Sequence, residues 1–172
     1  EYKAGMSIFG ICAMLFPGIH IYAFQLMSNH VHFVTSGEKS ETLDFFEHFK
    51  SRLGKHLPYT DLTEFKLKLN DIDSVEYFRY SVAYVNRNGF VVDDNVTPFS
   101  YPWGTSRCFF NPESRKYYEA SRKPMPIREM RELSHSRVPN QDSPIMCTDG
   151  YASPYSFCHT EIAERIFRNA RQ

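Results

Sequence analysis

Residues 19–35, which read IHIYAFQLMSNHVHFVT, decide the fold of this chain. Two runs rich in β-branched and aromatic residues, Ile19–Gln25 and His30–Thr35, flank a short link around Ser28 and Asn29. Residues of these types favour strands, and a short polar link between two such runs is typical of an antiparallel hairpin. We therefore expect a β-hairpin within the first forty residues of the chain.

Helical periodicity surrounds this hairpin. Apolar residues recur at spacings of three and four, and Pro or Gly follows several of these runs. The pattern predicts helices over residues 2–16, 42–56, 73–88 and 160–168, the third of them capped by Gly89. Phe65, Leu67 and Leu69 alternate with lysines, which predicts a half-buried strand with a basic outer face at 65–69.

The composition is that of one ordinary domain, with 172 residues, 42% hydrophobic and 23% charged. Twenty basic and twenty acidic side chains cancel, so attraction to a nucleic acid must come from a local patch. Four widely spaced cysteines indicate reduced thiols and a cytoplasmic protein. The most apolar run, residues 6–16, is shorter than the ~20 residues that span a bilayer, so no membrane partner is expected.

Two pairs of side chains are candidates for a functional site. His30 and His32 lie on the second predicted strand and share one face, ~6.6 to 6.8 Å apart along the backbone, while Val31 points to the other face. Two neutral imidazoles so placed can hold one cation. The same pattern is also expected for two histidines that are simply packed or exposed and have no ligand role. Tyr84 and Asn88 are four residues apart on the third predicted helix and therefore neighbours on one face.

Three stretches together resemble one protein family. Residues 23–34, with the core Met27-x-Asn29-His30-Val31-His32, resemble the HUH motif of single-tyrosine transposases, in particular the REP-associated tyrosine transposases. Residues 84–89 resemble that family's tyrosine helix, in which a nucleophilic Tyr precedes a metal-ligating Asn by four positions. Residues 101–106 are similar to its Tyr-Pro-Trp-Ser-Ser element, and the three motifs occur in the family's order.

The resemblance implies an α+β fold: a ferredoxin-like antiparallel sheet with helices on one face, the HUH endonuclease fold. It covers about residues 5–110, so we expect an HUH domain at 1–110 and a loop-rich, helical C-terminal extension at 111–172. The family's fold begins with a central strand before the first helix, whereas this chain opens almost in the helix. That strand is expected upstream or from another segment.

The implied activity is metal-dependent nicking and rejoining of single-stranded DNA at hairpin or palindromic ends, through a 5′-phosphotyrosine intermediate. Tyr84 would be the nucleophile, and His30, His32 and Asn88 the metal ligands. The family implies Mg²⁺ or Mn²⁺, although imidazoles by themselves suit zinc and other transition ions. Tyr80, one turn before Tyr84, is an alternative nucleophile, and a homodimer is expected.

Basic and aromatic side chains are candidates for DNA contacts through phosphates and unpaired bases. They are Lys50, Arg52, Lys55, Lys66, Lys68, Arg87, Trp103 and Arg107. Two other functions remain open. The chain could be a catalytically inactive or domesticated single-stranded DNA-binding module of the same fold. It could also be an unrelated α+β protein with a structural zinc site, which needs a fourth ligand that the sequence does not show.

Overall fold

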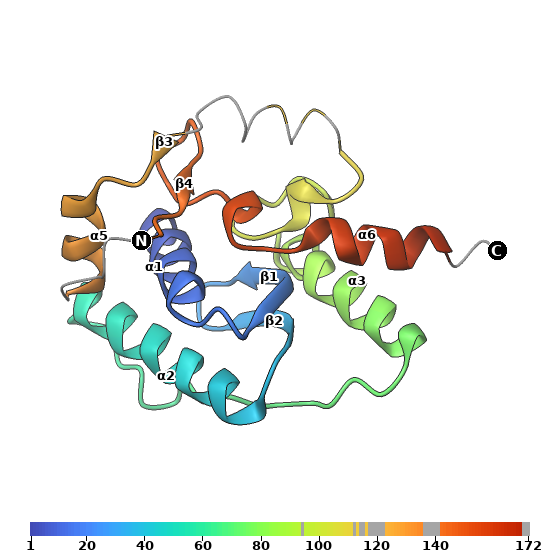
Figure 1. Cartoon of the computed structure of the whole chain (residues 1–172), viewed down its shortest axis with the longest axis horizontal. Helices are drawn as coiled ribbons and strands as arrows, with labels where there is room; N and C mark the ends of the chain where they lie inside the picture. The colour runs from blue at the N-terminus through green and yellow to red at the C-terminus, as the bar shows by residue number, and fades with distance from the viewer. Residues whose placement is uncertain (94, 112, 114–115, 117–122, 136–141, 170–172) are drawn as a thin grey trace.

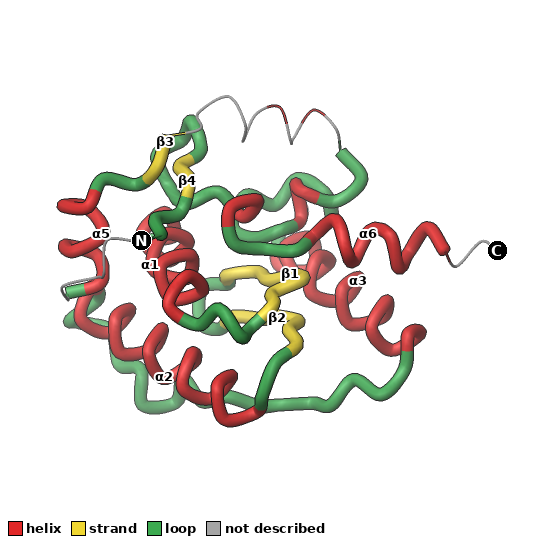
Figure 2. Tube along the Cα trace, in the orientation of Figure 1, coloured by secondary structure: helices red, strands yellow, loops and turns green. Residues whose placement is uncertain are grey.

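A computed structural model describes residues 1–93, 95–111, 113, 116, 123–135 and 142–169. These residues form five α-helices and two small antiparallel sheets, so the predicted α+β class is confirmed (Figures 1 and 2). In chain order the elements are α1 (Tyr2–Leu15), β1 (His20–Leu26), β2 (Val31–Ser36), α2 (Lys39–His56), α3 (Val75–Val92), η1 (Ser106–Cys108), β3 (Lys123–Pro124), α5 (Ile127–Ser134), β4 (Ile145–Met146), η2 (Pro154–Ser156) and α6 (Thr160–Arg168).

The predicted hairpin is present. Strands β1 and β2 pair antiparallel, with Phe24 opposite Phe33 and Gln25 opposite His32. The Met27 N–H donates to the His30 carbonyl oxygen at 2.8 Å and closes the link between the strands. The register shifts between Ile21 and Ala23, as in a β-bulge, so Tyr22 has no residue directly opposite it on β2.

Helices cover both faces of this hairpin, and the prediction of helices on one face is wrong. On one face the strands pack with α1 and α2 in an aromatic cluster containing Phe9, Phe24, Phe33, Phe45 and Phe49. On the other face they pack with α3 and α6 in a second cluster containing Ala23, Val34, Val82, Val85 and Ala163. Strand β1 is buried along most of its length, and a strand apolar on both sides needs cover on both sides.

Helix α1 forms where the first helix was predicted. Nine of its fourteen residues are buried, and the helix ends at Leu15, before Pro17 and Gly18. Its Phe9 ring stacks on Phe24 of β1 with centroids 4.4 Å apart. None of the helices in the described part of the chain is long and apolar enough to cross a membrane.

Described residues near the C-terminus join the same two clusters. Cys147, Tyr151 and Cys158 pack in the aromatic cluster on the α1 side. Helix α6 lies beside α3, where the Arg79 guanidinium donates to the Ile166 carbonyl oxygen at 2.8 Å (Figure 1). Part of the predicted extension, including residues 117–122 and 136–141, lies outside the described residues.

The strand predicted at residues 65–69 is wrong. These residues lie in irregular structure between α2 and α3, although their side chains alternate between half-buried and exposed as predicted. A period of two sets which side chains face the core, but a strand also needs a partner for its backbone ladder. Among the described residues the main sheet has two strands, and no strand precedes α1.

Candidate active site

The side chains of His30, His32 and Tyr84 lie in one row of ring contacts. The His30 and His32 centroids are 4.7 Å apart, and the His32 and Tyr84 centroids are 5.4 Å apart, both with planes near perpendicular. Tyr84 is 46% exposed, so its phenol is accessible from solvent. The hairpin and α3 therefore place two imidazoles and one phenol at a single surface site.

The alternation of side chains along β2 explains why the His32 ring faces Tyr84. Val31 and Phe33 pack against the aromatic cluster on the α1 and α2 side, whereas Val34 packs against α3. His32 lies two residues before Val34 and shares its face, so its ring points to the α3 side. His30 immediately precedes β2 and is exposed.

The His30 ring is held by its neighbour in sequence. Its Nδ1 lies 2.6 Å from the Asn29 side-chain oxygen, and because a carbonyl oxygen can only accept, Nδ1 carries the proton. In the neutral form of the ring, the other nitrogen, Nε2, then carries the lone pair that could bind a metal ion. A hydrogen bond of this kind commonly fixes the tautomer and orientation of a metal-ligating histidine.

His32 is biased toward its neutral form. Burial lowers the pKa of its imidazole, and the adjacent His30 lowers it further. Both effects disfavour the positively charged ring, because one removes water and the other places a second basic group nearby. Only the neutral imidazole can donate a lone pair to a metal, so His32 is suited to that role at neutral pH.

Asn88 lies one turn after Tyr84 and is half-buried. Its Nδ2 donates to the Tyr84 carbonyl oxygen at 2.7 Å and reaches the Val85 carbonyl oxygen at 3.4 Å. The amide nitrogen therefore faces the helix backbone, and the side-chain oxygen is the atom suited to a cation. Across the described residues, these hydrogen bonds stay within α3, and none joins Asn88 to either histidine.

The donor set is compatible with a divalent cation through two imidazole nitrogens and one carboxamide oxygen. Within the described ranges, no group of three or more His, Cys, Asp or Glu side chains is placed to hold a metal ion. The predicted set has two such residues, and its third member is Asn88. A cation held by this set would have three neutral ligands and open coordination positions, unlike a closed structural zinc site with four tight ligands.

Buried polar side chains, which the sequence analysis did not single out, attach α3 to β1. Gln25 is fully buried on β1; its Nε2 donates to the Ser106 hydroxyl at 2.9 Å, and its Oε1 accepts from the Gly89 N–H at 3.2 Å. The Ser106 hydroxyl donates in turn to the Asn86 carbonyl oxygen at 3.2 Å. In the sequence, the presence of polar Gln25 within the otherwise apolar run 21–27 is the feature that could have indicated this buried network. This network sets the position of α3, and hence of Tyr84, relative to the hairpin.

The segment 101–106 runs along the free edge of β1. The Leu26 N–H donates to the Trp103 carbonyl oxygen at 2.8 Å, and the Thr105 N–H donates to the Phe24 carbonyl oxygen at 2.9 Å. The Tyr101 hydroxyl donates to the Leu26 carbonyl oxygen at 2.8 Å. The third motif of the sequence therefore has a structural role, because it covers the β1 edge and joins it to α3.

Gly89 lies inside α3, and the prediction that it caps this helix is wrong. The helix continues to Val92, and Asp93 is its C-terminal cap. A Cβ on Gly89 would lie 2.3 Å from the Tyr101 ring, so the glycine permits close approach of the 101–106 segment. The absence of a side chain, rather than a left-handed backbone, is what this position requires.

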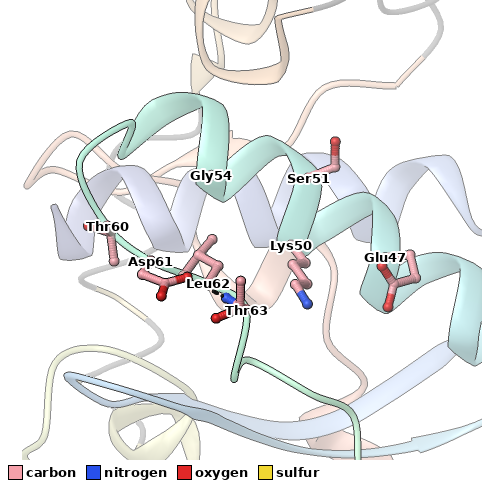
Figure 3. A pocket seen from close by; sticks show the side chains of 8 residues that line it. All are labelled: Glu47, Lys50, Ser51, Gly54, Thr60, Asp61, Leu62 and Thr63. Carbon is pink, nitrogen blue, oxygen red and sulfur yellow. Dashed lines mark hydrogen bonds between the residues drawn. The ribbon is translucent and has the colours of Figure 1, made fainter.

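The predicted DNA-contacting residues are not gathered at this site. Lys50, Arg52 and Lys55 belong to α2, which covers the opposite face of the hairpin from α3. Lys50 lines a shallow hollow of about 420 Å³ there, between α2 and residues 60–63, together with Glu47 and Asp61 (Figure 3). The hollow is lined by acidic as well as basic side chains, so its charge does not favour an anionic ligand such as DNA.

Other candidates have structural contacts. Trp103 is half-buried and its ring stacks on Tyr2 with centroids 5.2 Å apart. The Arg107 Nε donates to the Ser100 carbonyl oxygen at 2.9 Å. Lys66 and Lys68 are exposed in the irregular segment before α3. Arg87 is exposed, and it lies one turn after Tyr84 on α3, so it is the candidate cation nearest in sequence to the ring row.

Comparison with known proteins gave no match in any of three searches, against protein-family models, curated proteins and solved structures. A proposal for the function therefore rests on the three sequence motifs and on the contacts described above.

Proposed function

We propose that this protein is a metal-dependent endonuclease and strand transferase of the HUH tyrosine type, acting on single-stranded DNA with hairpin or palindromic ends. The observation that carries the proposal is the ring row His30, His32, Tyr84, which joins two predicted ligands and the predicted nucleophile at an exposed site. The ferredoxin-like sheet and the homodimer expected from the resemblance belong to the same proposal.

The Tyr84 hydroxyl oxygen attacks a backbone phosphorus and forms a new P–O bond. The bond from that phosphorus to the 3′ oxygen breaks, and the 3′ oxygen leaves with a proton as a free 3′-hydroxyl. The phenol proton passes to solvent, and the phosphate stays on Tyr84 as a 5′-phosphotyrosine. Attack by a 3′-hydroxyl on this linkage reverses the steps and rejoins the strand, because the phosphodiester energy is retained in the covalent bond.

The phenol needs assistance, since a group with an ordinary pKa of about 10 is a poor nucleophile at neutral pH. His30 Nε2, an His32 ring nitrogen and the Asn88 side-chain oxygen would hold Mg²⁺ or Mn²⁺. When bound, such an ion supplies positive charge to the non-bridging phosphate oxygens and so stabilises the transition state. All three ligands are neutral, so they leave the ion's charge undiminished. The Asn29 side chain would orient the His30 ring through the contact between its oxygen and His30 Nδ1.

A covalent adduct tests the proposal. The purified protein is mixed with Mn²⁺ and a labelled DNA hairpin carrying a single-stranded flank, and the products are separated on a denaturing gel. We expect a protein–DNA band that Tyr84→Phe abolishes. Tyr59→Phe is the matched control, because Tyr59 is fully exposed on a loop after α2 and makes no part of the site.

Two outcomes contradict parts of the proposal. An adduct that survives Tyr84→Phe but is lost in Tyr80→Phe shows that Tyr80 is the nucleophile. No adduct with Mg²⁺, Mn²⁺ or Zn²⁺, from a protein that still binds the hairpin, shows a binding module without nuclease activity.

A further inference from the structure

Three tyrosines form a row along the surface of α3. The rings of Tyr77 and Tyr80 are stacked with centroids 6.2 Å apart and planes 20° apart, and those of Tyr80 and Tyr84 are stacked at 6.2 Å and 21°. The three side chains are 36%, 63% and 46% exposed. The row continues into His32, because the Tyr84 ring contacts that imidazole. We call Tyr77, Tyr80 and Tyr84 the tyrosine ladder.

Packing against the described residues leaves all three rings of the ladder partly exposed. The buried side of α3 is formed by Val82, Val85, Asn86 and Gly89, which face β1 and the 101–106 segment. The tyrosines recur at spacings of three and four on another face, and pairs of this kind add little to helix stability. Several large aromatic side chains exposed side by side on one helix are typical of a binding surface.

We propose that the tyrosine ladder is a stacking platform for unpaired bases of the DNA strand whose phosphate reaches Tyr84. This inference rests on the proposed function. Aromatic rings stack on any base because every base has a π-face, so a row of near-parallel rings fits a single strand without demanding a sequence. Tyr84 contributes its hydroxyl to the reaction, and Tyr80 and Tyr77 hold the two nucleotides beyond the scissile phosphate.

The charges along α3 fit the same occupant. Arg87 is exposed one turn beyond Tyr84 and is placed to contact a phosphate of the strand. The Glu76 carboxylate, near the other end of the ladder, lies 3.9 Å from the Arg79 guanidinium, which offsets its negative charge. The ladder leads without a break to the candidate nucleophile, which favours the substrate strand over a second protein copy as its occupant.

Comparison of a normal and an abasic flank separates stacking from phosphate contact. The test uses full-length protein carrying Tyr84→Phe, which keeps the ring but cannot form the adduct. Fluorescence anisotropy measures the Kd for a hairpin with a single-stranded flank, and for the same hairpin with an abasic flank that retains every phosphate. We expect the normal flank to bind about tenfold more tightly or better.

Ladder substitutions should change this ratio selectively. In the same background, Tyr77→Leu with Tyr80→Leu should bring the ratio of the two Kd values close to one, whereas Tyr77→Phe with Tyr80→Phe should restore it. Tyr59→Leu removes an exposed tyrosine outside the ladder and should leave the ratio unchanged. Circular dichroism confirms that each variant is folded.

A ratio that stays the same in the double Leu variant overturns the ladder proposal. So does a double Leu variant that changes the molar mass in light scattering while the ratio is unaffected, since the ladder is then an interface between copies. Failure of the proposed function looks different: the protein lacks adduct formation altogether, yet the ratio responds to the ladder variants.

Discussion

The Tyr84 ring lies edge-on to the His32 ring, with centroids 5.4 Å apart and planes at 81°. The contact joins residues more than fifty positions apart in sequence, and it depends on how α3 packs against the hairpin. Helix α3 is attached there by buried hydrogen bonds around Gln25 and by close contact between Gly89 and Tyr101. The candidate site therefore depends on packing and buried polar contacts behind it, as well as on the residues that face solvent.

Affinity for Mn²⁺ should depend on His30 and His32, and on the Asn29 side chain that contacts His30. We expect His32→Ala to abolish tight Mn²⁺ binding, and Asn29→Ala to weaken it about tenfold because the His30 ring loses the hydrogen bond that orients it. Electron paramagnetic resonance of free Mn²⁺ in a titration measures both. His48→Ala, at an exposed position on α2, is the control. Wild-type affinity in His32→Ala would contradict the proposed ligand set.

A pair of glycine substitutions tests the close approach of Tyr101. Gly89→Ala should lower the free energy of unfolding by ~1–3 kcal/mol, because the new Cβ would lie 2.3 Å from the Tyr101 ring. Gly54→Ala, also within a helix, meets only the flexible end of Leu62 at 3.3 Å and should be neutral or stabilising by up to ~1 kcal/mol. Urea unfolding measures both. Equal effects at the two positions would show that Gly89 is not required for packing.

Gln25→Leu tests the buried hydrogen bonds behind the site. The variant keeps the approximate shape but removes the buried hydrogen bonds of the Gln25 amide to the Gly89 N–H and the Ser106 hydroxyl, which should cost ~1–3 kcal/mol in the free energy of unfolding. If the network positions α3, adduct formation by the folded variant should also slow, whereas Mn²⁺ affinity should change less. Urea unfolding and the adduct assay supply the two measurements. A variant as stable as the wild type would exclude this structural role for Gln25.

Stability should fall at alkaline pH because of buried thiols. Burial raises the pKa of Cys12 from 9.0 to about 12, an effect that Arg52 partly opposes, and burial also raises the pKa of Cys108 and Cys158. The folded state thus favours the neutral thiol. The stability that the neutral Cys12 thiol contributes is fully present below pH 9. It is lost as the pH rises toward 12, because this thiol ionises at lower pH in the unfolded chain than in the folded protein.

The Cys12 part of this effect is separable. Cys12→Ala should make the decline in unfolding free energy shallower by up to ~1.4 kcal/mol per pH unit above pH 9, whatever it costs in packing at pH 8. Urea unfolding at several pH values between 8 and 11 gives the two slopes. Parallel slopes in the wild type and the variant would mean that Cys12 ionises as easily in the folded protein as in the unfolded chain.

Local patterns predicted local structure well and tertiary partners poorly. The alternation at residues 65–69 correctly indicated which side chains are half-buried, but it could not supply a neighbouring strand, and the segment is irregular. Gly89 looked like a helix cap because glycine often ends helices, whereas its contact with Tyr101 depends on a segment twelve residues away. Burial of β1 on both faces was readable from its nearly continuous apolar run, which the prediction of helices on one face overlooked.

The sequence by itself determined the hairpin, the positions of α1, α2, α3 and α6, the common face of His30 and His32, and the one-turn spacing of Tyr84 and Asn88. These features follow from backbone periodicity, which depends on residues close together in the chain. Only the tertiary structure decided that Tyr84 meets His32, that Trp103 packs on Tyr2, and that the α2 cations lie across the hairpin from α3. Such contacts depend on how separate elements bury their apolar faces against one another, and no local pattern encodes that choice.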